Sequence, residues 1–97
     1  MNFEWDDAKN QANIRNHDLS FADAWQIFDA PMLTEIDNRK DYGEKRFVGI
    51  GFLRNFIVVI VFTEPQADTI RVVSLRKALK YEREKFERAI RNQLGET

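Results

Sequence analysis

The feature that most constrains the fold is an apolar stretch at residues 55–64, NFIVVIVFTE, near the middle of the chain. Its core, the run IVVIVF at residues 57–62, is rich in β-branched side chains and is bounded by polar residues. Such side chains lose rotamer freedom in helices and pack well in sheets. The run is also far shorter than the roughly 20 apolar residues of a membrane-spanning helix. It therefore predicts a strand buried on both faces, flanked by strands at residues 46–53 and 69–75.

Helices and strands on either side of this stretch complete a predicted α+β fold in a single domain. Asp6 is a good N-cap for a helix that ends near His17, and Ser20 caps a second helix that ends before Pro31. A final helix is expected from Ser74 to Arg91. The predicted architecture is two N-terminal helices, an antiparallel sheet of about four strands, and a C-terminal helix, with the helices packed on one sheet face. The remaining segments are a possible edge strand or tether at residues 2–5 and a strand at residues 32–36.

Apolar residues at helical spacing indicate which helix faces are buried. Each of the three helices is expected to bury one stripe of apolar side chains. The stripe of the last helix also contains Glu82, and we expect its carboxylate to be paired with an arginine or a backbone amide. In the strand at residues 69–75, alternation predicts one face with Ile70, Val72 and Ser74 and the other with Arg71. The expected buried residues are Trp5, Ala8 and Ala12 in the first helix, Phe21, Ala24, Trp25 and Phe28 in the second, and Ala78, Leu79, Phe86, Ala89 and Ile90 in the last.

Composition excludes several classes of site. The chain has 97 residues, no cysteine and one histidine. A disulfide framework and a thiolate metal site are therefore excluded, and no metal site or cofactor is expected. The absence of cysteine is compatible with the cytosol, no stretch resembles a signal peptide or a membrane span, and a cytoplasmic location is expected.

Charge is distributed unevenly along a chain whose net charge is −1. Residues 1–44 carry 10 acidic and 4 basic groups, whereas residues 76–91 carry 3 acidic and 7 basic groups. Such asymmetry is typical of an anion-binding face, although a solvated charged helix gives the same pattern. Direct DNA binding is disfavoured, because a net charge of −1 gives little sequence-independent attraction to phosphates.

Several short motifs, in this order and spacing, resemble the BrnT family of bacterial type II toxins within the RelE/ParE superfamily. The resemblance spans the chain from Phe3 to about Glu82. Two positions differ from the usual pattern, Asp18 where glycine commonly follows the histidine and Pro65 where a basic residue often follows the Thr-Glu pair. The motifs are FEWD (residues 3–6), Lys9 with Asn13, HDLSFADA (17–24), DYGEKR (41–46), VFTE (61–64) and IRVVSLRKA (70–78).

This resemblance implies a RelE-like fold and cleavage of RNA, with or without the ribosome, that arrests translation. It also implies a BrnA-like antitoxin with a ribbon-helix-helix part, which represses the operon together with the toxin. DNA would then be contacted only through the antitoxin. Because ribbon-helix-helix proteins dimerise, we expect a hetero-oligomer with an even number of chains of each kind.

RNA cleavage without a metal needs a base for the 2′-OH, cations for the phosphorane and an acid for the 5′-oxygen. We predict that His17 is the acid or base, because histidine changes charge near neutral pH. Arg71 and Arg76 suit bidentate phosphate contacts. Together with Lys9, which lies on the helix face of His17, they are expected to bind and neutralise the scissile phosphate. Glu64, at the end of the central strand, is the reserve base.

Further substrate contacts are expected from Asn13, which aligns with Lys9 and His17 at helical spacing, and from Lys77 and Lys80. Structural roles remain open for the same residues. A histidine in a last helical turn often serves as a cap, and Arg71 is able to pair with Glu64 or Glu82.

Two other functions are compatible with the sequence. One is a non-catalytic interaction module that docks a partner and represses transcription with it. The other is a ParE-like poison of gyrase. Cleavage of RNA by the isolated protein separates the predicted ribonuclease from both.

Overall fold

The sheet is built around β4 (Phe56–Gln66), the strand predicted from the apolar stretch. The computed structural model describes residues 1–93 of the chain. Three consecutive residues at the centre of β4, Val58, Val59 and Ile60, are at most 3% exposed, so both faces of the strand are buried. The strand pairs antiparallel with one neighbour on each side, as predicted. The elements in chain order are β1 (Asn2–Glu4), α1 (Asp7–His17), the short 3₁₀ helix η1 (Phe21–Asp23), α2 (Trp25–Phe28), β2 (Met32–Ile36), β3 (Phe47–Leu53), β4, β5 (Thr69–Lys77) and α3 (Lys80–Gln93).

Five strands form one mixed sheet in the order β1-β5-β4-β3-β2. This is one strand more than the expected number, because the N-terminal segment adds to the edge of β5. That pairing is parallel and sets Phe3 opposite Ile70 and Glu4 opposite Arg71. The three other pairings are antiparallel. The α+β class is confirmed, and the all-antiparallel sheet is corrected to a mixed one.

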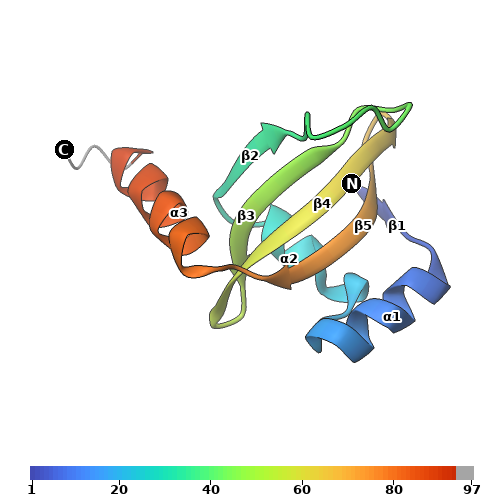
Figure 1. Cartoon of the computed structure of the whole chain (residues 1–97), viewed down its shortest axis with the longest axis horizontal. Coiled ribbons are helices and arrows are strands. Elements are labelled where there is room, and N and C mark those ends of the chain that lie inside the picture. The colour runs from blue at the N-terminus through green and yellow to red at the C-terminus, as the bar shows by residue number, and fades with distance from the viewer. Residues whose placement is uncertain (94–97) are drawn as a thin grey trace.

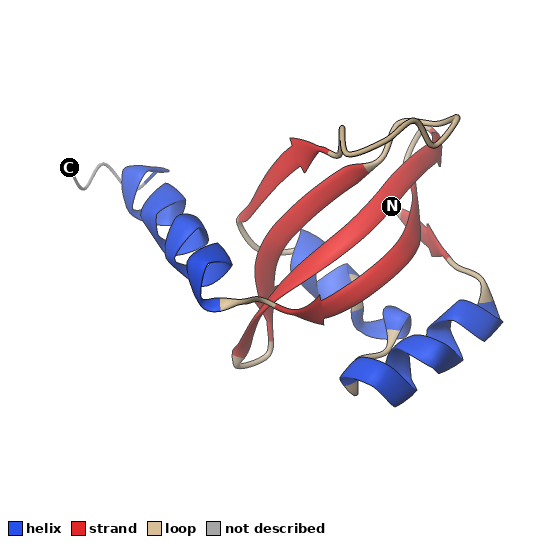
Figure 2. Cartoon of the chain, viewed as in Figure 1, coloured by secondary structure: helices blue, strands red, loops and turns tan. Residues whose placement is uncertain are grey.

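The helices cover both faces of the sheet, so the prediction of one covered face is wrong. One core cluster joins η1 and α2 to the sheet through Phe21, Ile27 and Ile60. A second cluster lies on the opposite face, where α3 inserts Phe86 beside Ile50. Figures 1 and 2 look onto this second face, with α2 behind the strands and α3 beside the sheet rather than across it. Helix α3 therefore covers part of the second face, mainly over β2 and β3.

A bulge in β5 changes which residues share a face. Val61 pairs with Ser74 and Phe62 with Val72, so Val73 is the extra residue. Simple alternation had predicted Ser74 on the face of Ile70 and Val72. Because one residue is inserted, Leu75 joins those two in the first core cluster, and Ser74 and Arg76 join Arg71 on the second face.

The last helix begins six residues later than predicted. Residues 74–77 continue β5, with Arg76 opposite Val59 and Lys77 opposite Val58. The helix starts only at Lys80, where the Glu82 carboxylate accepts the backbone N–H of Leu79 at 2.8 Å and so caps the first turn. The two cations at 76 and 77 therefore belong to the sheet.

Several predicted buried positions are also corrected. Helix α1 buries Asn10 and Asn13, whereas Ala8 is exposed. The second predicted helix is interrupted, since η1 and α2 replace one continuous helix, and this turns Trp25 outward. Leu79 is exposed as well, because it precedes α3. Within residues 1–93, no helix combines the length and the apolar character that crossing a membrane requires.

Candidate functional site

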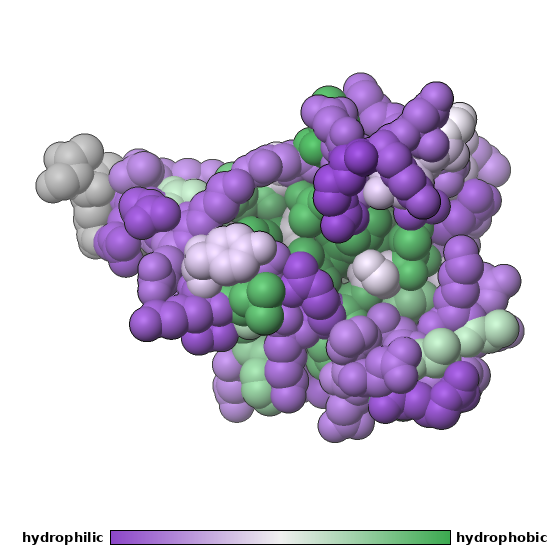
Figure 3. Space-filling view, in the orientation of Figure 1, coloured by the Kyte–Doolittle hydropathy of each residue, from purple (hydrophilic) through white to green (hydrophobic). Residues whose placement is uncertain are grey.

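The uncovered part of the second sheet face is hollow. We call it the sheet-face hollow. Figure 3 shows an apolar patch in the hollowed middle of this view, surrounded by hydrophilic side chains. The β-branched side chains of β3 and β4 supply the apolar surface, because alternate residues of both strands point to this side. The hollow is lined by Glu35, Ile36, Asp37, Asn38, Arg39, Val48, Val59, Val61, Ser74, Arg76, Tyr81 and Glu82.

Arg76 is held at one side of this hollow by Glu82. Its Nη1 and Nη2 donate to the two carboxylate oxygens at 2.8 and 2.9 Å, and Nη1 also donates to the carbonyl of Lys77 at 3.3 Å. The hydrogen bonds from Arg76 lower the pKa of Glu82, although burial opposes the shift, and they raise the pKa of Arg76. Both groups therefore stay charged. The prediction that Glu82 pairs with an arginine or a backbone amide is confirmed, and the carboxylate has both partners.

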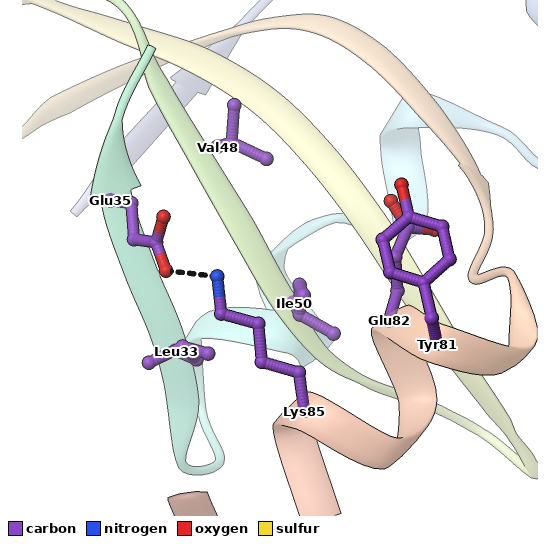
Figure 4. Close-up of a pocket in the computed structure, with 7 residues that line it drawn as sticks. All are labelled: Leu33, Glu35, Val48, Ile50, Tyr81, Glu82 and Lys85. Atoms are coloured by element: carbon purple, nitrogen blue, oxygen red, sulfur yellow. Dashed lines mark ion pairs between the residues drawn. The ribbon is translucent and has the colours of Figure 1, made fainter.

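Tyr81 stands next to this pair in the first turn of α3. Figure 4 shows its ring beside Glu82, above a small notch between α3 and the sheet where Lys85 reaches Glu35. Tyr81 lines both the notch and the sheet-face hollow and is 67% exposed. Its ring is therefore available to a ligand from the solvent side.

A second arginine–carboxylate pair lies in the loop after β2. Arg39 donates from Nε and Nη2 to the two oxygens of Asp37, both at 2.8 Å, and the hydroxyl of Tyr42 donates to Asp37 at 3.3 Å. The hydrogen bond from Arg39 is the main cause that lowers the pKa of Asp37 to about 2. The guanidinium of Arg46 stacks 4.0 Å above the Tyr42 ring and orders the same loop.

His17 lies at the rim of a second hollow, which we call the histidine hollow. The end of α1 supplies the histidine, and the end of β5 supplies Arg76 and Lys77 across from it. Asp18 adopts a left-handed conformation that turns the chain away from α1. The lining residues are Arg15, Asn16, His17, Asp18, Arg76, Lys77 and Leu79. Arg76 is thus common to both hollows and joins them.

The two other predicted residues of α1 lie elsewhere. Asn13 is buried and hydrogen-bonded to the backbone, since Nδ2 donates to the Leu19 carbonyl at 2.9 Å and Oδ1 accepts the Leu75 N–H at 3.1 Å. Its amide holds α1 to β5 and has a structural role. Lys9 is exposed on the side of His17, but eight residues of helix separate them by about 12 Å.

Arg71, Glu64 and Lys80 are not among the residues that line the two hollows. Arg71 pairs through Nε and Nη2 with the carboxylate of Glu4 on β1, at 2.7 Å, rather than with either predicted partner. Glu64 lies in a separate hollow near the end of β4, beside Lys45. Lys80 is exposed at the first residue of α3.

Sequence analysis missed the residues that line the sheet-face hollow from the loop and from α3. Asp37 and Arg39 belong to the segment DNRKDYGEK at residues 37–45, which the sequence predicts to be a charged turn. Tyr81 is predicted only as an exposed helical residue. The only signal for Asp37 was its place directly after a strand. Among residues 1–93, no cluster of three or more His, Cys, Asp or Glu side chains is placed to hold a metal ion.

Comparisons with known proteins agree with this architecture. A family model described as the ribonuclease toxin BrnT of type II toxin–antitoxin systems matches residues 5–82. The crystal structure of the Brucella abortus ribonuclease toxin BrnT is similar, with a TM-score of 0.64 and 28% identity, over 82% of this chain and 99% of that one. No curated protein sequence matches the chain significantly.

Proposed function

Because the chain belongs to the BrnT family of ribonuclease toxins of type II toxin–antitoxin systems, we propose that it is an endoribonuclease that cleaves RNA without a metal ion. Such cleavage of RNA would arrest translation in the cytoplasm. The observation that carries the proposal is the histidine hollow, in which His17, the chain's one histidine, shares a lining with the cations Arg76 and Lys77.

In the proposed step, the RNA 2′-oxygen loses its proton to a base and attacks the adjacent phosphorus, while the 5′-oxygen leaves with a proton from an acid. His17 serves as that acid or base. In this proposal Arg76 neutralises the charge that develops on the phosphorane oxygens, and Lys77, which lines the same hollow, adds a second positive charge. Glu82 fixes the direction of Arg76 through two hydrogen bonds, so that the cation needs little rearrangement in the transition state.

The other predicted residues take secondary places in the proposal. Lys9 and Arg71 are exposed cations outside the two hollows, suited to phosphates further along the RNA rather than to the one that is cleaved. Lys80 serves in the same way. Glu64 remains the reserve base, and its separate hollow makes it the second choice. Asn13 is withdrawn as a substrate ligand because its amide is already used by the backbone.

The test is the integrity of RNA after purified, antitoxin-free protein is added in the presence of EDTA. We expect cleavage by the wild type, a loss of about 10²- to 10⁴-fold in His17→Ala, and a comparable loss in Arg76→Ala. Arg54→Ala is the matched control, because Arg54 is also an arginine with one carboxylate partner and lies in neither hollow.

Two results would contradict the proposal. Cleavage at the wild-type rate by folded His17→Ala and Arg76→Ala proteins would remove both residues from the mechanism. Intact RNA with the wild type, with or without ribosomes, would favour a protein that acts only through its partner.

We further propose a BrnA-like antitoxin with a ribbon-helix-helix part as the partner, with which the toxin represses its own operon. The basic segment of residues 76–91 is the surface that such a partner would cover, and complementary charge would speed the association. Light scattering on the co-purified pair should give an even number of toxin chains, and a stable 1:1 species would argue against this assembly.

A further inference from the structure

The two hollows differ in charge although they share Arg76. The lining of the histidine hollow has three cationic side chains and one carboxylate, without counting His17. The lining of the sheet-face hollow has two arginines and three carboxylates. Each arginine there is held by a carboxylate of the same lining, and Glu35 pairs with Lys85. The first hollow attracts an anion, whereas the second presents no uncompensated positive charge.

The sheet-face hollow instead offers an apolar floor with planar groups beside it. Val48, Val59 and Val61 form the floor. The ring of Tyr81 and the guanidinium of Arg39 come from α3 and from the loop after β2, and both side chains are largely exposed. Aromatic rings and guanidinium planes are the groups on which unpaired bases stack in single-stranded nucleic acids. The cavity of about 370 Å³ is within the usual range of small-ligand sites.

We propose that the sheet-face hollow binds one nucleobase of the RNA, the base next to the phosphate held at Arg76. This inference rests on the proposed ribonuclease function and adds the place where the substrate base sits. A base is neutral and flat, so it suits a hollow whose charges are internally paired and whose floor is apolar. Arg76 lines both hollows, and this places base and phosphate side by side. The hydroxyl of Ser74 and the amide of Asn38 lie in the same lining, where they are available to the polar edge of the base.

The test measures binding with an RNA that the protein cannot cleave. Two fluorescein-labelled hexamers are compared by fluorescence anisotropy. One is 2′-O-methyl RNA with all its bases, and the other is the same backbone with every base removed. Both carry the same charge, so their difference reports contacts to bases alone. We expect the hexamer with bases to bind about 10- to 100-fold more tightly.

Variants then assign that difference to the hollow. Val61→Phe fills the floor, and Tyr81→Ala removes the exposed ring without touching the core. Each should bring the affinity for the hexamer with bases close to that for the abasic hexamer and leave the latter unchanged. Thr34→Phe is the matched control, because it adds the same ring at an exposed position of β2 that is not in the lining.

An equal affinity for the two hexamers in the wild type would overturn the inference, as would a difference that persists in both Val61→Phe and Tyr81→Ala. The outcome is separate from that of the proposed function, because 2′-O-methylation removes the attacking hydroxyl. Base-dependent binding by a protein that leaves ordinary RNA intact would uphold the base site and refute the ribonuclease. Cleavage without base-dependent binding would do the reverse.

Discussion

Replacing Asn13 by alanine tests whether this residue is part of the scaffold or of the substrate site. Its side chain joins the loop after α1 to the backbone of β5, by hydrogen bonds of 2.9 Å to the Leu19 carbonyl and 3.1 Å from the Leu75 N–H. With alanine at this position, the buried Leu19 carbonyl and Leu75 N–H both lose the side-chain amide as a hydrogen-bond partner. A buried polar group that loses its partner costs about 1–3 kcal/mol.

The expected loss in free energy of unfolding is therefore about 2–5 kcal/mol, after allowance for the slightly better helix propensity of alanine. For a domain of this size each kcal/mol lowers the melting temperature by roughly 4–8 °C, so Asn13→Ala should melt about 10 °C or more below the wild type. Urea denaturation followed by circular dichroism measures the first quantity, and a thermal scan measures the second.

Asn16→Ala is the matched control, because Asn16 is an exposed asparagine of the same helix. Its free energy of unfolding should change by no more than about 0.5 kcal/mol. If Asn13→Ala were as stable as Asn16→Ala, the scaffold role would be refuted. A full loss of RNA cleavage in a stable Asn13→Ala protein would return this residue to the substrate site.

Three further predictions concern acidity, packing and the cap of α3. The pKa of Asp37 is lowered to about 2, so its ion pair with Arg39 stabilises the fold above about pH 4, and this stabilisation is lost as the pH falls toward 2. Urea denaturation should therefore give different stabilities for the wild type and Asp37→Asn at pH 6. The two stabilities should converge near pH 2. Gly51→Ala should lower the free energy of unfolding by about 1–3 kcal/mol, because the new Cβ would lie 2.8 Å from a methyl group of buried Ile27. Gly49→Ala should cost less, because the atom nearest to its new Cβ is the end of the flexible Met32 side chain, which is able to move. Equal shifts in the melting temperatures of the two variants would contradict this. Glu82→Gln should lower the free energy of unfolding by about 1 kcal/mol at pH 7, since the half-buried guanidinium of Arg76 loses its charged partner. An unchanged urea midpoint would contradict this.

The elements that follow from local chemistry were predictable. The β-branched run of β4 identified the centre of the sheet, and Asp6 identified the start of α1, where its carboxylate accepts the N–H of Lys9 at 2.9 Å. The pairing of Glu82 followed from the cost of burying an isolated carboxylate. Each of these inferences depends on neighbours in sequence or on a single side chain.

Features that depend on distant pairing were not predictable. The bulge at Val73 comes from the register between β4 and β5, and it decides that Arg76 faces the hollows. Nothing in the composition of residues 74–77 favours a strand over the start of a helix. The burial of Asn13 likewise depends on a strand 62 residues away.

The same distant pairings have a consequence for synthesis of the chain. The segments that are synthesised first, β1 and α1, pair with β5, which is synthesised near the end. Glu4 forms its ion pair with Arg71, and Asn13 accepts a hydrogen bond from the Leu75 N–H. Contacts across more than 60 residues close slowly and late in folding. A ribosome that stops before Ser74 therefore releases a fragment that lacks every residue that β5 contributes to the two hollows. The candidate site should therefore assemble only once nearly the whole chain has been made.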